Sequence, residues 1–470
     1  HSFPTRRSSD LLLFLVSEGI RQSGTLGQVI KKLLPQGKTT VFKAQLRLLP
    51  SVAFISAFLN NTPVVVIFAP IIKHWANSVK LPATKFLIPL SYVTILGGIC
   101  TLIGTSTNLV VHGMILDAGF EGFSMFELGK VGIFIAIAGI IYLFVFSKRL
   151  LPDARPDTAV PDEEVEEGEE GEKLHRVEAV LGARFPGINK KLKDFNFQRH
   201  YGAEVKEIKT RNGQRFVTNL EDIVLHEGDT LVVMADDTFI PTWGESSVFV
   251  LLTNGSDPDT AGKKKRWFAL FLLVLMIVGA TVGELPIVRE MFPDIKLDMF
   301  FFVSITTIIM AWTNLFPARK YTKYISWDIL ITIACAFAIS KAMVNSGVAD
   351  CVAKFIIGLS DDYGPHVLLA MLFIITNLFT ELITNNAAAA LAFPLALSIS
   401  TQMGVSPTPF FVVICMAASA SFSTPIGYQT NLIVQGIGNY KFMDFVRIGL
   451  PLNIITFLIS VILIPMIWNF

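Results

Sequence analysis

The sequence predicts an all-α polytopic membrane protein with two repeats, hairpins and broken helices, plus a small α+β cytoplasmic insert. Of its 470 residues, 52% are hydrophobic and only 16% are charged, whereas soluble domains carry about 25% charged residues. The charges are unevenly placed, because most of them lie between Lys148 and Arg266. Two polar motifs also recur in the apolar halves at a nearly constant spacing. These observations indicate two membrane halves around a soluble segment.

Long apolar blocks lie on both sides of the soluble segment. A helix needs about 20 mostly apolar residues to cross a bilayer. Several blocks are longer than one crossing, or are interrupted by Pro, Gly or Asn, which is typical of hairpins and discontinuous helices that line a protein-enclosed cavity. The blocks are Leu48–Trp75, Phe86–Leu116, Val131–Phe146, Trp267–Leu285, Met299–Leu315, Ile329–Val344, Val367–Ile383, Ala387–Ser400, Phe410–Val434 and Ile448–Phe470.

The segment between the halves differs in kind. It opens with an acidic linker, residues 151–174, whose cluster DEEVEEGEEGE we expect to be disordered because it cannot bury enough apolar surface. Residues 175–240 contain short alternating strands such as Glu204–Ile208 and Thr230–Val233, which predict a small α+β domain. A second linker, residues 241–266, leads into the second half.

Positive charges flank this segment on both sides. Lys148 and Arg149 precede it, and the run Lys263–Arg266 follows it. Short loops rich in Lys and Arg stay on the cytoplasmic side of a membrane. We therefore expect residues 151–266 to be cytoplasmic and the chain to be a multi-pass protein of the inner (plasma) membrane.

The chain begins with the polar, basic string SFPTRRSSDL before its first apolar run. This string resembles a translated sequencing adaptor, so we interpret residues 1–10 as a non-native artefact. On this interpretation the first transmembrane repeat, residues 11–150, is incomplete at its N-terminal side. The second transmembrane repeat covers residues 267–470.

Each half carries a polar tripeptide inside an apolar block. Asn60–Thr62 reads NNT, and Thr384–Asn386 reads TNN at positions 324 residues later. Ser56 and Thr380 precede the tripeptides by four residues. Asn side chains that faced lipid would be costly. We therefore expect the tripeptides to lie at the tips of hairpins inside the protein.

A second motif follows each tip. IGTSTNLVV (Ile103–Val111) matches IGYQTNLIV (Ile426–Val434) at an offset of 323. Gly104 and Gly427 within these motifs allow close backbone approach at a helix break. Hydrogen bonding between helices is the usual role of a single Asn in a membrane bundle, but two motifs that recur in the same order indicate an internal duplication.

The residue types at the tips suit two kinds of ligand. Asn and Thr oxygens, with carbonyls freed at a helix break, suit a hard cation such as Na⁺. Amide N–H groups, hydroxyls and helix N-termini suit an anion. No phosphate-binding loop or nucleophile motif is present, Cys and His lack metal-site spacing, and the net charge of +1 does not favour nucleic acid. We expect a transporter, not an enzyme, with no cofactor besides a coupling ion.

These motifs resemble the divalent anion/sodium symporter (DASS) family of the ion-transporter superfamily, which has a Ser-Asn-Thr signature at each of two hairpin tips. The resemblance implies secondary active transport, in which Na⁺ completes a site for a small anion and the hairpins move relative to a scaffold. It also implies a homodimer in membrane lipid. The tips and the following TSTN and YQTN motifs depart from the family pattern, so the anion stays open between sulfate and a dicarboxylate. Carried over by motif, the substrate site comprises Asn61, Thr62, Thr105, Asn385, Asn386 and Tyr428, one Na⁺ site comprises Ser56, Asn60, Asn61 and Gly104, and the other comprises Thr380, Ile383 (through its carbonyl), Asn385 and Gly427.

The insert resembles the TrkA-C (RCK C-terminal) regulatory module of K⁺-conductance regulators. Three stretches carry the resemblance: GINKKL at Gly187–Leu192, YGAEVKEI at Tyr201–Ile208 and EGDTL at Glu227–Leu231. Symporter-like halves around such modules are often associated with sulfate, which makes sulfate our leading substrate. The insert would either bind a small regulatory ligand or assist assembly.

Other functions stay open at this stage. One is an arsenite or Na⁺/H⁺ antiporter of the same superfamily. Another is a K⁺-linked transporter, although the sequence has no TVGYG-like filter. A third is a membrane sensor whose insert binds a ligand. Lys341 and Glu381 are further functional candidates, because ionisable groups in apolar blocks are expensive; Glu381 would either tune the neighbouring cation site or pair with Lys341.

Overall fold

The computed structural model describes most of the chain, and the predicted artefact at residues 1–10 and most of the acidic linker lie outside the part described. The described residues are 12, 15–35, 37–153, 166–167, 173–182, 184–210, 215–236, 238–243, 248–253, 263–283, 286–291, 297, 299–315, 327–358 and 364–470.

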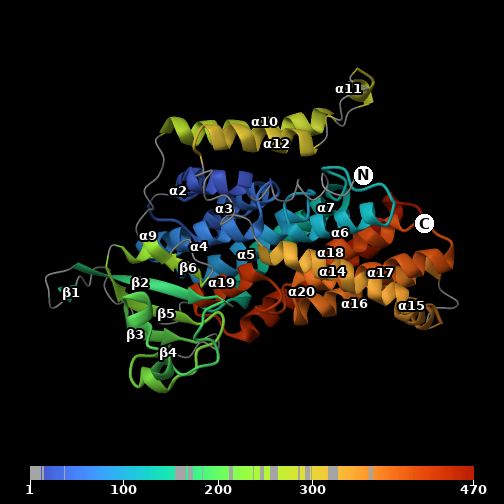
Figure 1. Ribbon diagram of the computed structural model, residues 1–470. Coiled ribbons are helices and arrows are strands. Elements are labelled where there is room, and N and C mark those ends of the chain that lie inside the picture. The colour runs from blue at the N-terminus through green and yellow to red at the C-terminus, as the bar shows by residue number, and fades with distance from the viewer. Residues whose placement is uncertain are drawn as a thin grey trace.

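The first half contains a helical hairpin, a broken helix and one long helix (Figure 1). Thr40 caps the first arm of the hairpin by accepting a hydrogen bond from the Lys43 N–H at 3.4 Å, and residues 57–60 form the turn between the arms. The predicted block Phe86–Leu116 forms two helices that are separated by residues 99–105. In order, the helices are α2 (Thr25–Leu33), α3 (Val41–Ser56), α4 (Asn61–Ser78), α5 (Thr84–Gly98), α6 (Ser106–Asp117) and α7 (Gly129–Leu150).

The second half repeats this order after five leading helices among the described residues. A hairpin is again followed by a broken helix, and then by a long C-terminal helix. Figure 1 shows α10 and α12 side by side in a layer next to α2. The helices are α10 (Lys263–Gly283), α11 (Pro286–Met291), α12 (Met299–Trp312), α14 (Trp327–Asn345), α15 (Val348–Gly358), α16 (Gly364–Leu382), α17 (Asn385–Met403), α18 (Thr408–Ser419), α19 (Gln429–Gly438) and α20 (Phe442–Ile467).

Four of the described helices are long and apolar enough to cross a membrane. They are α7, residues 264–283 of α10, α16 and α20, with mean hydropathies between 1.6 and 2.4. Two shorter apolar segments, Phe300–Trp312 and Thr408–Ser419, accompany them. Many large side chains on these helices, such as Phe134 and Ile462, are exposed, which suits contact with lipid. The predicted polytopic membrane fold with hairpins and broken helices is confirmed.

The two halves pack against each other reciprocally. In the second half, α19 contacts α4 and α5 of the first half, and in the first half α6 contacts α17 and α18 of the second. Because α4, α5 and α6 correspond in order to α17, α18 and α19, each contact has its equivalent in the other half. One continuous apolar core therefore contains side chains from both halves.

The long helices α7 and α20 each cross closely behind a helix break. A Cβ at Gly132 of α7 would lie 2.7 Å from the Ile99 carbonyl oxygen, and a Cβ at Gly449 of α20 would lie 2.0 Å from the Phe422 carbonyl oxygen. Ile99 and Phe422 are equivalent, since they are 323 positions apart. Gly132 and Gly449 are thus equivalent too, which sets the register between α7 and α20.

The insert is a small antiparallel sheet with short helices (green in Figure 1). The predicted strands at Glu204–Ile208 and Thr230–Val233 are present. The sheet extends beyond the predicted limits of the domain. β6 lies within the predicted second linker and pairs with β2, and β1 lies within the predicted acidic linker and also pairs with β2. The strands are β1 (Glu166–Glu167), β2 (Lys173–Leu181), β3 (Glu204–Lys209), β4 (Arg215–Phe216), β5 (Thr230–Ala235) and β6 (Phe249–Thr253), in the order β1-β2-β5-β3-β4.

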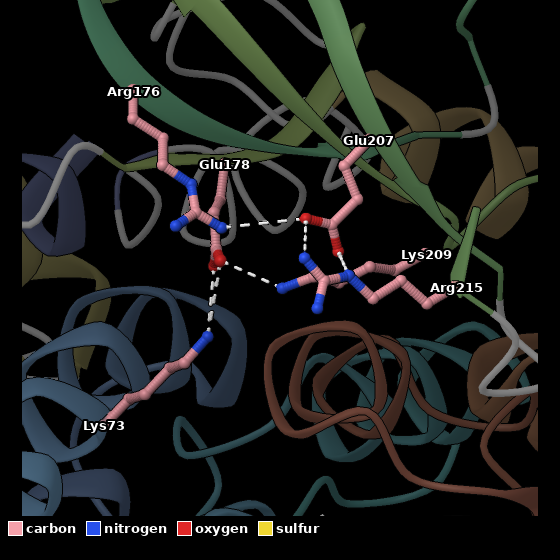
Figure 2. Close-up of polar contacts among 6 residues, drawn as sticks. All are labelled: Lys73, Arg176, Glu178, Glu207, Lys209 and Arg215. Carbon is pink, nitrogen blue, oxygen red and sulfur yellow. Dashed lines mark hydrogen bonds and ion pairs between the residues drawn. The ribbon is translucent and has the colours of Figure 1, made fainter. Parts of the chain in front are cut away.

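Alternation along the strands gives the sheet two different faces. Val177, Ala179 and Ile208 are buried in a core that belongs to the insert alone. Glu178 and Lys209 point to the opposite face, because successive strand residues alternate sides. This charged face lies toward the helices of the membrane part (Figure 2).

Candidate functional site

Each hairpin tip is a short turn that ends in a helix N-terminus. At the first tip Asn60 is the N-cap of α4 and Asn61 is its first residue. At the second tip Thr384 caps α17 by accepting a hydrogen bond from the Ala387 N–H at 3.4 Å, and Asn385 begins the helix. Both tripeptides therefore expose helix N–H groups where the sequence predicted hairpin tips.

The break between α5 and α6 is tied to the first tip by side chains. The Asn108 amide donates to the Thr101 carbonyl at 2.8 Å and to the Gly98 carbonyl at 3.5 Å. The Thr101 hydroxyl donates to the Ala57 carbonyl in the hairpin turn and accepts from the Gly104 N–H at 3.1 Å. The chain between the two helices is therefore held against the hairpin without regular secondary structure.

The same contacts recur in the second half. Asn431 donates to the carbonyls of Ser421 at 2.9 Å and Thr424 at 3.1 Å. Thr424 donates to the Glu381 carbonyl at 3.0 Å and accepts from the Gly427 N–H at 3.4 Å. Each of these residues is the equivalent, 323 or 324 positions later, of one in the first half. The duplication thus preserves the contacts that join break and tip.

A hydroxyl from the second half joins the first tip. Asn61 donates to the Tyr428 hydroxyl at 2.7 Å, and Thr105 shares a hydrogen bond of 2.8 Å with the same hydroxyl. On its other side the Asn61 amide oxygen accepts from Ser56 at 2.8 Å. The Asn61 side chain is fully buried, so one amide connects the hairpin turn to the opposite half.

A second group forms around the other tip. Asn385 donates to the Thr107 hydroxyl at 2.8 Å. The Asn386 amide oxygen accepts from Ser106 at 3.2 Å and lies 3.4 Å from the Thr107 hydroxyl. Thr62 of the first tip donates to the side chain of Gln429 at 3.3 Å. The tip of each half therefore contacts the helix N-terminus of the other half.

The structure brings the six predicted substrate residues into two adjoining groups. Asn61, Thr105 and Tyr428 form the first, Asn385 and Asn386 belong to the second, and Thr62 reaches Gln429. Four helix N-termini, those of α4, α6, α17 and α19, carry these residues. Their partial positive charge and free N–H groups favour an anion.

Several contributors were not predicted as site residues. Ser106, Thr107 and Gln429 contact the tips, and Asn108 and Asn431 hold the breaks. The signal for them was present, because all five lie inside the two matched motifs. Their individual roles depend on which side of a short helix faces the tip, and the motifs alone did not specify this.

Backbone oxygens gather at the predicted Na⁺ site of the first tip. A Cβ at Gly104 would lie 2.6 Å from the Gly98 carbonyl oxygen and 2.9 Å from the Ala57 carbonyl oxygen. The Asn61 amide oxygen would lie 2.6 Å from a Cβ at Gly98. With the Ser56 hydroxyl, these neutral oxygens fit a hard cation such as Na⁺, which unwound backbone carbonyls coordinate in transporters. Ala57 and Gly98 were not predicted as ligands.

The predicted Na⁺ site of the second tip also has two oxygens close to its glycine. A Cβ at Gly427 would lie 2.1 Å from the Thr380 carbonyl oxygen and 2.0 Å from the Ser421 hydroxyl. The Thr380 hydroxyl donates to the Ala418 carbonyl at 2.7 Å. Ile383 lies in the turn just before Asn385 and is partly exposed. Among the described residues no group of three or more His, Cys, Asp or Glu side chains could hold a metal ion.

Glu381 has polar partners on its own side of the molecule. Its carboxylate accepts from the Ser423 N–H at 2.8 Å and from the Asn453 amide at 2.7 Å. Lys341 on α14 is exposed. The partner of Glu381 is therefore Asn453 of α20 and not Lys341, and its role in tuning the neighbouring cation site stays a prediction.

Comparison with known proteins agrees with this architecture. A transporter of Synechocystis of uncharacterized function is 28% identical over 544 aligned positions, which cover 98% of this chain and 88% of that protein. The sodium/sulfate cotransporter 2 of Chlamydomonas reinhardtii is 31% identical over 281 positions, which cover 60% of this chain and 31% of the relative. The crystal structure of the Alcanivorax borkumensis YdaH transporter has a similar fold, with a TM-score of 0.53 at 11% identity over 99% of this chain and 87% of that one.

The family match covers nearly the whole chain. The model of the citrate transporter family, CitMHS, matches residues 11–399 and, in an overlapping match, residues 295–470. Its members are membrane permeases and not enzymes. The chain therefore belongs to the citrate transporter (CitMHS) family.

Proposed function

We propose that this transporter couples Na⁺ entry to the uptake of a divalent anion. The observation that carries the proposal is the position of Asn61. Its amide oxygen faces Ser56 and the carbonyls near Gly104, and its amide N–H faces Tyr428. A cation bound to the oxygen would fix the amide and direct its N–H toward an anion. Na⁺ and anion binding would thereby be coupled through one side chain.

The second tip would act in the same way. Asn385 would contribute to a Na⁺ site with Thr380, Gly427 and the Ile383 carbonyl, while its N–H faces Thr107. The anion would lie between the tips, bound by the helix N-termini together with the six predicted substrate residues. Neutral N–H and O–H donors with helix ends are suited to an anion whose hydration shell must be replaced. After binding, the hairpins would move relative to the long helices and expose the site on the other side.

Sulfate is the leading substrate, and a dicarboxylate is the alternative. A named sodium/sulfate cotransporter is among the relatives, and the site offers hydroxyl and amide donors in place of charged ones. Sulfate needs many donors around a compact centre, whereas a dicarboxylate needs two separated clusters. The two polar groups at the tips are compatible with either arrangement, so the assay below includes both anions.

The orientation and assembly remain proposals. The flanking charges at Lys148, Arg149 and Lys263–Arg266 favour a cytoplasmic insert in a protein of the plasma membrane. The homodimer, the TrkA-C likeness of the insert and a small regulatory ligand there also stay predictions.

Uptake into proteoliposomes tests the proposed function. An inward Na⁺ gradient should drive accumulation of radiolabelled sulfate or succinate, and equal Na⁺ on both sides should not. Asn61→Ala and Asn385→Ala should each abolish Na⁺-dependent accumulation. Asn77→Ala is the matched control, because Asn77 is an exposed residue at the far end of the same helix as Asn61.

Three results would contradict the proposal. Proton efflux that is driven by an inward Na⁺ gradient and needs no anion would favour a Na⁺/H⁺ antiporter of the same superfamily. Flux of K⁺ that is independent of any anion would favour a K⁺ pathway. Asn61→Ala and Asn385→Ala variants that bind and accumulate the anion like the parent would exclude the assigned site.

A further inference from the structure

The insert contacts two helices that begin at the anion site. On α19, a Cβ at Gly436 would lie 2.7 Å from the Thr230 hydroxyl and 3.6 Å from the Val180 side chain. Val180 of β2 accordingly packs with the core of the membrane part. The neighbouring turn approaches the same helix, because a Cβ at Gly228 would lie 3.4 Å from Leu432. Only a residue without a side chain at position 436 permits this close contact.

An ion pair joins the insert to α4. Glu178 of β2 lies 3.3 Å from the Lys73 ammonium of α4 and 3.2 Å from the Lys209 ammonium of β3 (Figure 2). The three side chains are between 6% and 18% exposed. Lys73 is the partner that belongs to the membrane part, and Lys209 is the partner within the insert. We call the Glu178–Lys73 contact the α4 bridge.

A second cluster of charges supports the α4 bridge from within the sheet. Arg215 donates to the Glu207 carboxylate at 2.8 Å, and Arg176 lies 3.9 Å from the same carboxylate. Figure 2 shows these side chains beside Glu178 and Lys209 on the face of the sheet that lies toward the helices. The charged face is therefore internally paired, which holds Glu178 in position for Lys73.

The α4 bridge stays ionised over the whole neutral range. Burial alone would raise the pKa of Glu178, but the charges of Lys73 and Lys209 and their hydrogen bonds lower it to about 2. A carboxylate with a depressed pKa stabilises the folded arrangement above its ordinary pKa and loses this effect only as the pH falls toward the lowered value. The Glu178 carboxylate is therefore ionised at neutral pH, so the α4 bridge responds to movement of α4 and not to pH changes in that range.

The position of the bridge connects it to the transport site. Lys73 follows Asn61 by twelve residues of the same helix, which is about 18 Å at 1.5 Å per residue. The chain joins the insert directly to α7, which ends at Leu150, and this junction is fixed because Lys85 donates to the Lys148 carbonyl at 2.8 Å. The insert therefore connects a long helix of the scaffold to the moving arm of the first hairpin.

We propose that the insert restrains alternating access by holding α4 in the observed position through the α4 bridge and α19 through the close contact at Gly436. Movement of the first tip would then require the insert to move with α4 or the bridge to open. A change in the insert would in turn alter the transport rate without contacting the substrate. The proposal rests on the proposed function for the movement of the first hairpin and for the anion used in the uptake assay.

Two substitutions distinguish the loss of the α4 bridge from the loss of any positive charge beside Glu178. Lys73→Met and Lys209→Met each remove one partner of Glu178, but only Lys73 crosses between the insert and the membrane part. Lys73→Met should raise the maximal uptake rate about fivefold, the low end of allosteric coupling, with unchanged Na⁺ dependence. Lys209→Met should stay near the parent rate, and Lys73→Arg should restore the parent behaviour because it keeps the charge.

Hydrogen exchange of the full chain in lipid nanodiscs provides a second readout that needs no substrate. Lys73→Met should increase exchange in α4 and at the start of β5, and should leave α16 and α17 unchanged. If the parent takes up neither anion, the proposed function fails while the exchange measurement still decides the restraint. Equal uptake and exchange in Lys73→Met and Lys209→Met would overturn the restraint, as would slower uptake in Lys73→Met with parent-like exchange.

Discussion

At the tip of the first half the turn contains Ala57, whereas the equivalent residue at the tip of the second half is Glu381. Both residues use their backbone carbonyl in the same way, since each accepts a hydrogen bond from a Thr hydroxyl in the break, Thr101 in one half and Thr424 in the other. Only Glu381 adds a carboxylate, which reaches Ser423 and Asn453. The backbone contacts are shared, and the charge belongs to one half.

The partner of Glu381 differs between the halves as well. Gly132 and Gly449 occupy equivalent positions on α7 and α20, so Asn453, four residues beyond Gly449, corresponds to Ala136. The first half therefore has two alanines where the second half has a carboxylate and an amide. Conversely, Lys73 of α4, which holds the insert, corresponds to Leu397 of α17. The two halves share the backbone contacts that form the site and differ in the polar side chains behind it.

The largest expected effect comes from disrupting the helix breaks at Gly104 and Gly427, where both halves pack a glycine against oxygens of the adjoining tip or break. Gly427→Ala would place a methyl group about 2 Å from the Thr380 carbonyl oxygen, and Gly104→Ala would place one within 3 Å of the Gly98 and Ala57 carbonyls. Overpacking of this kind costs about 1–3 kcal/mol, and this cost falls on the transport-competent geometry of the break. Since about 1.4 kcal/mol corresponds to a tenfold change in rate, uptake should fall about five- to 150-fold. Initial rates of Na⁺-driven uptake measure this loss.

The two glycine variants also show which half tolerates an added methyl group less well. Gly427→Ala should be the more damaging, because its contacts are closer than those at Gly104. Gly358→Ala is the control, since a Cβ at Gly358 has nothing within 4 Å. If Gly104→Ala and Gly427→Ala both transported like Gly358→Ala, the breaks would not be the rigid, carbonyl-lined structures that the shared contacts suggest.

Much of this comparison was accessible from the sequence. The offset of 324 between Asn61 and Asn385 predicted equivalent tips, because polar residues in an apolar block must face protein. The apolar block Phe86–Leu116 was too long for one crossing and contained Gly104, which together predicted a broken helix. Spacing along the chain was sufficient because hairpins and breaks are local structures.

The features that the sequence did not reveal depend on contacts between distant segments. Lys73 and Glu178 are separated by 105 positions, and nothing in either local pattern indicates that they meet. The family resemblance placed Tyr428 and Asn61 in one substrate site, but their direct hydrogen bond depends on the packing of α19 against α4. The strand β6 was assigned to a linker, because five residues that complete a sheet edge give a weak signal.

The second prediction sharpens the comparison by removing the charge that one half alone carries. Glu381→Ala would leave the Ser423 N–H and one of the two N–H groups of the Asn453 amide without an acceptor, and an unsatisfied buried donor costs about 1–3 kcal/mol. The free energy of unfolding should fall by that amount, which denaturant titration in detergent measures. The variant would give the second tip the alanine that the first tip has naturally.

A double-mutant cycle shows whether Glu381 and Asn453 stabilise the second half as a pair. Asn453→Ala alone should also destabilise the protein, and the double variant should lose less than the sum of the single variants, with a coupling of about 0.5–3 kcal/mol. Additive losses would mean that Glu381 and Asn453 act independently and not as a pair.

The smallest effect concerns the break amides, Asn108 and Asn431. The Ser91 hydroxyl lies 2.6 Å from the Asn431 amide oxygen, whereas the Asn108 amide oxygen is buried without a hydrogen-bond partner among the described residues. The difference follows from Ile414, which stands 323 positions after Ser91 and has no hydroxyl. Ser91→Ala should therefore make the second half resemble the first, at a cost of about 0.5–1.5 kcal/mol in unfolding free energy, with uptake nearly unchanged.

Ser460→Ala is the matched control for this substitution, because the buried Ser460 hydroxyl has no hydrogen-bond partner among the described residues and its removal should be close to neutral. The two variants differ only in whether the lost hydroxyl serves a break. The first half forms its break although the Asn108 amide oxygen has no hydrogen-bond partner among the described residues. Ser91→Ala should therefore weaken the second break but preserve its geometry. Equal stability of the Ser91→Ala and Ser460→Ala variants would show that the amide N–H bonds to the backbone carbonyls, which both halves share, are sufficient to hold each break.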